Sequence, residues 1–219
     1  MSNDIRLEGV DVAFKGRPLF ANVSLHVESG ERVALMAPSG TGKTTILRLL
    51  SGVSVPDAGR VCMGDVVVSG LSIEQRAAFR ATRVGQVFQD ASLLPELTAV
   101  ENVALLATLT GSSRAAAQER ASELLGALGL ANNLAARTWE LSGGEAQRVA
   151  VARALMVDDV AFLLADEPTA SLDLTSANRV VEALLDLSTE RSLTMVIATH
   201  DDRIAARCDR IVDLIGVTA

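Results

Sequence analysis

Residues 37 to 45, with the sequence APSGTGKTT, combine small residues with a lysine and three threonines. A continuous apolar run, RVALMA, leads into this segment, and a helix pattern, KTTILRLL, leads out of it. Glycine-rich backbone between a buried strand and a helix presents N–H groups to phosphate oxygens. We therefore expect a phosphate-binding loop. Lys43 would neutralise the β- and γ-phosphates of a nucleotide, Thr44 would place its hydroxyl on Mg²⁺, and Thr45 would reach a further phosphate oxygen.

The loop departs from the pattern G-x-x-x-x-G-K-[ST] at its first position, which is Ala37. Because a methyl group is small, we expect nucleotide binding to survive, with altered strain in the loop. The alternative is a plain turn into a helix. The residues expected to bind the nucleotide are Ala37, Pro38, Ser39, Gly40, Thr41, Gly42, Lys43, Thr44 and Thr45.

Two adjacent carboxylates end a second apolar run, VAFLLADEP. Ligands in an open α/β sheet bind beyond the carboxyl ends of the strands. Asp166 is expected to hold the Mg²⁺ shell through water, and Glu167 to orient and deprotonate the attacking water. A pair of solvated loop acids is the alternative, and the neighbouring phosphate loop weakens it.

Other candidates end further predicted strands. His200 follows LTMVIAT and could hydrogen-bond the γ-phosphate, although a structural or surface histidine is an equal alternative on position alone. Gln89 ends VGQVFQ, where its amide could ligate Mg²⁺ or simply be a polar residue at the start of a helical insertion. Phe14 ends the first predicted strand and could stack on an adenine ring, with core packing as the rival interpretation.

A second candidate anion site lies in ELSGGEAQRVAVARAL, residues 140 to 155. Ser142 precedes the pair Gly143 and Gly144 and then a helix pattern. The free N–H groups and the dipole of a helix start attract anions. Trp139, shortly before this turn, is expected to pack beneath the helix start without a chemical role. One chain would then carry two phosphate sites.

The elements that must position these residues follow an α/β pattern. The first third reads as strands, among which NVSLHV alternates cleanly. Residues 92 to 141 are rich in Ala, Leu and Glu with helical spacing of the apolar residues. The last third alternates buried strands with helices, which predicts a mainly parallel sheet covered by helices.

Composition limits the classes of function. The 219 residues carry a net charge of −7, which argues against a nucleic-acid partner. Cys62 and Cys208 are far apart without metal spacing and are expected to be free thiols in a reducing compartment. Neither a secretory signal nor an apolar stretch of roughly 18 residues is present. We expect a cytoplasmic protein that reaches a membrane only through a partner.

Taken together, the motifs resemble the ATP-binding-cassette (ABC) ATPase family over nearly the whole chain. In family order they are Phe14, APSGTGKTT, Gln89, the signature LSGGE, FLLADE, SLD ending at Asp173, and His200. The resemblance implies an α/β P-loop NTPase fold with a mainly parallel core sheet, an antiparallel N-terminal β subdomain and a helical signature subdomain. It implies a single ABC ATPase domain, residues 1–219, with the helical subdomain inserted at about 91–145. Its cofactors would be ATP and Mg²⁺, and its catalytic residues Glu167, His200 and Lys43.

The resemblance also accounts for the two phosphate sites. In this family two nucleotide-binding domains pack head-to-tail, and each signature covers the ATP on the other domain. Ser142, Gly143 and Gly144 would then grip the γ-phosphate in trans, and Asp173 would communicate between the two sites. The implied assembly is a homodimer that ATP closes and hydrolysis opens.

The segment VGQVFQDASLLPELTAVENV is similar to a branch that includes lipoprotein-releasing, macrolide-export and cell-division ATPases. Members of this branch drive a membrane protein with few spans, and the helical insertion holds a groove for one of its cytoplasmic helices. Ala170 and Glu145 depart from the usual residues of this branch.

The leading interpretation is the ATP-hydrolysing subunit of an ABC transporter. It would power a separate integral membrane permease, with export or membrane extraction favoured, and lie peripherally on the inner face of the cell membrane. The alternative is a regulatory ATPase that acts through a membrane partner without transport. A family member acting on DNA or ribosomes is disfavoured by the acidic charge, and a degenerate cassette by the intact Lys43, Asp166, Glu167 and His200.

Overall fold

The structure is a computed structural model that describes residues 2–14, 16–38 and 40–214. Its strands are β1 (Ile5–Phe14), β2 (Arg17–Val27), β3 (Arg32–Met36), β4 (Ala58–Met63), β5 (Val66–Val67), β6 (Val84–Val87), β7 (Phe162–Asp166), β8 (Thr194–Thr199) and β9 (Arg210–Asp213). Its α-helices are α1 (Lys43–Leu50), α2 (Ile73–Arg83), α3 (Ala99–Leu109), α4 (Arg114–Ala127), α5 (Gly143–Ala154), α6 (Leu174–Glu190) and α7 (Asp202–Ala205). Short 3₁₀ turns span Val68–Gly70 and Thr138–Glu140.

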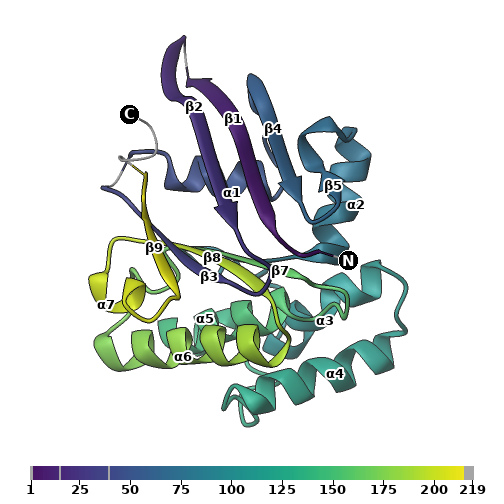
Figure 1. Cartoon of the computed structure of the whole chain (residues 1–219). Coiled ribbons are helices and arrows are strands. Elements are labelled where there is room, and N and C mark those ends of the chain that lie inside the picture. Colours follow the sequence, from purple (N-terminus) through teal and green to yellow (C-terminus); the bar gives the residue numbers. More distant parts are fainter. Residues whose placement is uncertain (1, 15, 39, 215–219) are drawn as a thin grey trace.

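Two sheets divide the strands. An antiparallel sheet has the order β2-β1-β4-β5, and a parallel sheet has the order β6-β7-β8-β3-β9. Helix α1 lies between the two sheets, while α5, α6, α3 and α4 lie on the other side of the parallel sheet (Figure 1). The predicted fold class, a mainly parallel core sheet with an antiparallel N-terminal sheet, is confirmed.

The strand types follow from which faces are buried. Along β7, Phe162 and Leu164 join the apolar cluster on the α1 side, whereas Leu163 and Ala165 join the cluster beneath α5 and α6. A strand buried on both faces needs apolar residues at every position, which explains the uninterrupted run. In β2, by contrast, alternate residues from Val23 to Val27 are buried and those between them are exposed.

Helix α5 joins the parallel sheet to the helical segment. Its Val151 and Ala154 pack in the cluster under the sheet, while Val149 and Ala152 pack with α3 and α4. A helix that is apolar on two sides must be buried between two layers. The helices of the expected insertion are therefore anchored to the core through α5, and the boundaries of that insertion stay a prediction.

No helix among the described residues combines the length and the apolar composition that crossing a membrane requires.

The close packing of β6 against the end of α5 gives a stability prediction. A Cβ on Gly85 would lie 2.5 Å from the carbonyl oxygen of Ala154, so Gly85→Ala must displace backbone. We expect it to lower the free energy of unfolding by about 1–3 kcal/mol, measured by urea denaturation.

Gly126 in α4 is the matched control. A Cβ there would meet nothing within 4 Å, so Gly126→Ala should raise stability by up to about 1 kcal/mol through helix propensity. Equal effects of the two substitutions would contradict the packing described here.

Candidate nucleotide site

Three strand ends of the parallel sheet bring the predicted catalytic residues together. The order β7-β8-β3 makes these strands direct neighbours, and all of them point the same way. Lys43 follows β3, Glu167 follows β7 and His200 follows β8. The side chains of Lys43 and His200 both contact Glu167. The parallel arrangement thus gathers residues that are far apart in the sequence.

The phosphate-binding loop is formed by left-handed glycines and a close aromatic contact. Gly40 and Gly42 have φ angles of 82° and 102°, and Gly42 is the N-cap of α1. A Cβ on Gly42 would lie 2.3 Å from Cζ of Phe20, so only glycine fits against this ring. Ala37 is not among the residues with positive φ, so its methyl group brings no left-handed strain. Ser39 lies outside the described residues.

The ammonium group of Lys43 is nearly buried, with 7% of the side chain exposed. Its Nζ donates to the carbonyl oxygen of Ala37 at 2.5 Å and of Pro38 at 3.4 Å. The Oε1 atom of Glu167 lies 3.3 Å from the same nitrogen. A buried cation needs such partners, because an unpaired charge away from water is costly.

Glu167 adopts a strained backbone conformation. Its φ is 44°, in the left-handed region that a non-glycine residue rarely occupies, and its N–H donates to the carbonyl oxygen of Ala198 at 2.8 Å. Both carboxylate oxygens lie 2.9 Å from Nδ1 of His200. The side chain of Glu167 is 13% exposed, whereas that of His200 is 62% exposed. The site therefore pairs an enclosed carboxylate with an open imidazole.

A cleft of about 440 Å³ borders these residues, and we call it the P-loop cleft. Thr44 and Asp166 meet in it, because Oγ1 of Thr44 donates to Oδ2 of Asp166 at 2.7 Å. Gln89 lines the same cleft, as does Phe14, which is 66% exposed at the end of β1. The cleft is lined by Phe14, Leu19, Pro38, Gly40, Gly42, Lys43, Thr44, Thr45, Gln89, Asp166 and Glu167.

Mg²⁺ suits the donors at the floor of this cleft. Hydroxyl, carboxylate and amide oxygens are hard ligands, and Thr44, Asp166 and Gln89 supply one of each. Magnesium usually keeps waters and phosphate oxygens in its shell, so it does not need a cage of protein ligands. In the described part of the chain no cluster of three or more His, Cys, Asp or Glu residues offers such a cage.

The signature residues do not line the P-loop cleft of their own chain. Ser142 is the N-cap of α5 and forms a capping box with Glu145. The N–H and the hydroxyl of Ser142 donate to Oε2 of Glu145 at 2.8 and 2.7 Å, and these bonds lower the pKa of that carboxyl. Asp173 likewise caps α6, and hydrogen bonds from Ser176 lower its pKa. Neither Ser142 nor Asp173 is among the residues that line the P-loop cleft.

The two helix starts are packed tightly against each other. A Cβ on Gly144 would lie 2.7 Å from Cβ of Ser176, so the second signature glycine is required by packing. The expectation for Trp139 was wrong: it is 70% exposed on the 3₁₀ turn before α5 and does not pack beneath the helix start. Val149 of α5 packs instead in an apolar cluster that includes Leu125 of α4.

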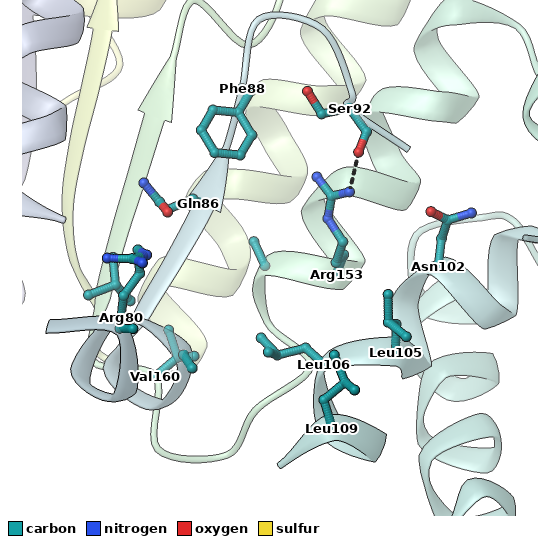
Figure 2. A pocket seen from close by; sticks show the side chains of 14 residues that line it. Arg80, Gln86, Phe88, Ser92, Asn102, Leu105, Leu106, Leu109, Arg153 and Val160 are labelled. Atoms are coloured by element: carbon teal, nitrogen blue, oxygen red, sulfur yellow. Dashed lines mark hydrogen bonds between the residues drawn. The ribbon is translucent and has the colours of Figure 1, made fainter. Parts of the chain in front are cut away.

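A second cavity, of about 400 Å³, lies between α2, β6, α3 and α5, and we call it the α3 groove. The leucines of α3 form one side of it, and Arg80 and Gln86 lie on the other (Figure 2). Arg153 of α5 donates to the carbonyl oxygens of Ala91 and Ser92 at 2.8 and 2.7 Å.

Helix α5 therefore holds the segment that carries Gln89. Besides the bonds of Arg153, Nε2 of Gln147 donates to the carbonyl oxygen of Phe88 at 2.7 Å. Sequence reasoning missed Phe20, Gln147 and Arg153. The sequence signal for Gln147 was its polar side chain on a helix face otherwise made of Gly144, Val151 and Ala154, because a polar group on a buried face needs a hydrogen-bond partner.

Comparisons with known proteins show to which family the chain belongs. A sequence profile of the family described as ABC transporter matches residues 20–170. The chain is 42% identical to a lipoprotein-releasing system ATP-binding protein, LolD, of Bacteroides thetaiotaomicron, over 98% of each protein. It is 44% identical to LolD of Gluconobacter oxydans, over 96% of this chain and 92% of that protein.

A solved structure supports the same assignment. The ATP-binding cassette MJ0796, in a dimeric post-hydrolysis state bound to ADP and Pi, superposes with a TM-score of 0.88 at 33% identity. The match covers 96% of this chain and 94% of that one. The chain therefore belongs to the ABC transporter family, as one of its ATP-hydrolysing cassettes.

Proposed function

We propose that this chain is the ATPase subunit of a membrane transport system of the lipoprotein-releasing type and that it powers a separate integral membrane permease. The observation that carries the proposal is the alignment of 98% of this chain with 98% of a protein named as the ATP-binding component of such a system.

ATP would lie in the P-loop cleft, with its adenine on the exposed ring of Phe14 and its phosphates against Pro38, Gly40 and residues 42–45. Lys43 already points its ammonium group at the loop carbonyls of Ala37 and Pro38. Phosphate oxygens are stronger acceptors than neutral carbonyls, so the nucleotide would take over these bonds. Binding thus exchanges contacts within the loop for contacts to ATP.

In the hydrolytic step, water attacks the γ-phosphorus and the bond from that phosphorus to the β,γ-bridging oxygen breaks. ADP and inorganic phosphate are released, and the carboxylate of Glu167 accepts the proton of the attacking water. His200, 2.9 Å from both oxygens of Glu167, orients this carboxylate and contacts the γ-phosphate. The hydrogen bond from the N–H of Glu167 to the carbonyl oxygen of Ala198 holds its strained backbone in place.

Thr44, Asp166 and Gln89 would hold Mg²⁺ in this site. When bound, the ion neutralises charge that develops on the β- and γ-phosphates. The hydrogen bond from Thr44 to Asp166 keeps both oxygens facing the cleft.

The signature helix start would serve a second copy of the chain. Its N–H groups at Gly143 and Gly144 begin α5, and neither residue lines the P-loop cleft of its own chain. The dimeric state of MJ0796 supports a partner that completes the site. Two chains packed head-to-tail would place each signature over the other's γ-phosphate, with Asp173 at the contact between them.

Removing the proposed base separates binding from chemistry. Glu167→Gln should reduce ATP turnover by about a hundredfold or more while leaving ATP binding intact, because a neutral amide cannot accept the proton. Lys43→Ala should instead lose ATP binding itself. Phosphate release and fluorescent-nucleotide titration measure the two effects.

Glu182→Gln is the matched control, since this carboxylate lies on α6 outside the P-loop cleft. It should leave turnover unchanged. Full activity of Lys43→Ala would overturn the assignment of the whole site.

A signature variant tests the contribution in trans. Gly143→Asp adds a negative charge at the start of α5, where a Cβ meets only Cδ2 of Leu172, at 3.3 Å. We expect the variant to fold and to bind ATP as a monomer, yet to lose ATP-dependent dimerisation in the Glu167→Gln background. Light scattering with and without ATP measures this, and a dimer that forms normally would contradict the proposal. Gly144 is unsuitable because its substitution clashes with Ser176.

The α3 groove is the proposed docking site for a cytoplasmic helix of the permease. Leu105, Leu106 and Leu109 offer it an apolar side, and Leu109 is 73% exposed (Figure 2). Phe88 lines the groove next to Gln89 and is held through its carbonyl by Gln147. A helix seated here would therefore contact the segment that carries a proposed Mg²⁺ ligand.

Leu109→Glu should abolish capture of the permease from gently solubilised native membranes by tagged Glu167→Gln protein with ATP and Mg²⁺. Ile73→Glu is a close control, because Ile73 is 72% exposed but lies outside the groove. Mass spectrometry of the captured proteins should find an integral permease with the control and not with Leu109→Glu. Recovery of only ribosomal or DNA-associated proteins would contradict the transporter role.

The names of the relatives favour extraction of lipid-anchored proteins from the membrane over a purely regulatory role. The protein would then act on the cytoplasmic face of the inner membrane. Reconstitution with the captured permease tests this: ATP-dependent release of a lipid-anchored protein from vesicles supports transport. ATP turnover without release would favour the regulatory alternative.

A further inference from the structure

We propose that the α3 groove selects a partner helix that carries a carboxylate beside its apolar stripe, and that Arg80 and Gln86 bind this carboxylate. The inference rests on the proposed docking of a permease helix and adds the chemistry by which the helix is recognised. Some polar side chains of the groove already make hydrogen bonds within the chain, whereas others keep donors or acceptors for a ligand.

The groove has two chemically different sides. The leucines of α3 form the apolar side, and Arg80 of α2 with Gln86 of β6 forms the polar side (Figure 2). An amphipathic helix fits a groove of this kind, with its apolar stripe on one wall and a polar flank on the other.

Three polar side chains of the groove are already satisfied. Asn102 uses its oxygen for the N–H of Leu94 and its nitrogen for three carbonyl oxygens. Both terminal nitrogens of Arg153 donate to loop carbonyls, and the hydroxyl of Ser92 donates to Asp90. These groups hold the walls of the groove and have little capacity left for a ligand.

Two polar side chains of the groove, Gln86 and Arg80, can still form hydrogen bonds to a ligand. Within the described ranges, the side-chain amide of Gln86 makes no hydrogen bond, and Gln86 lines the groove. Arg80 makes one long bond, from Nη1 to the carbonyl oxygen of Ser51 at 3.3 Å, and no ion pair with any described carboxylate. A purely apolar helix would cover both groups without replacing their water, which is costly.

The charge of the groove decides the sign of the partner group. Arg80 and Arg153 line it, and among the residues that the structure describes no Asp or Glu does, although the whole chain carries a net charge of −7. The pKa of the Arg153 guanidinium is lowered by burial, while the nearby Asp90 acts in the opposite direction. A carboxylate accepts hydrogen bonds from both Arg80 and Gln86 and meets a favourable field, whereas an ammonium group meets repulsion.

The test uses three fluorescent helical peptides of about five turns that differ at one residue beside a leucine stripe, which is Glu, Gln or Lys. Fluorescence anisotropy gives their affinities for the full chain with ATP and Mg²⁺. The Glu peptide should bind roughly tenfold more tightly than the Gln peptide, and the Lys peptide most weakly. High salt should shrink the difference.

Two substitutions locate the effect. Arg80→Gln should reduce the preference for Glu to roughly threefold or less, and Arg80→Glu should reverse it in favour of Lys. Arg60→Gln, which removes an exposed arginine of β4 outside the groove, should change nothing. Thermal melting of each variant checks that it folds.

The outcomes separate this inference from the docking proposal. Equal binding of the three peptides, each weakened by Leu109→Glu, would overturn the carboxylate preference and leave the docking groove standing. Preference for Lys, or a Glu preference that survives Arg80→Glu, would also overturn it. Binding of none of the peptides would overturn both proposals.

Discussion

The burial of one ammonium group governs the arrangement of the site. Lys43 can be almost enclosed only because loop carbonyls and Glu167 surround it. Those partners are in reach because β7, β8 and β3 are adjacent and parallel, and because the ring of Phe20 presses on a loop that has glycine at position 42. A change in strand order or in this glycine would leave a charge without partners, so the fold and the chemistry depend on the same contacts.

The strained backbone of Glu167 belongs to the same arrangement. A residue with a φ of 44° is retained only where neighbouring contacts hold it, and here the bond to the carbonyl oxygen of Ala198 and the imidazole of His200 do so. The carboxylate is therefore placed before any nucleotide arrives. Preorganised groups lower the cost of reaching the transition state.

The order of apolar and polar residues along the chain predicted most of the fold and the residues of the cleft. Both depend on patterns within short segments of sequence. Strands buried on two faces gave continuous apolar runs at β3, β7 and β8, and the polar residues after them marked the sheet edge where the proposed site lies. Contacts between distant segments could not be predicted in this way. The bonds from Arg153 to the loop after Gln89 and the exposure of Trp139 depend on how helices pack, which periodicity does not specify.

Helix α5 has twelve residues and is about 18 Å long. It starts at the turn that would meet the partner's phosphate, and farther along, Gln147 and Arg153 grip the border of the α3 groove. An α-helix is stiff over this length, so a displacement of its start also displaces the residues that hold the border of the α3 groove. If both the proposed dimer and the proposed docking hold, thermodynamic linkage requires reciprocity: a docked helix that favours the closed dimer would also tighten the binding of ATP to that dimer.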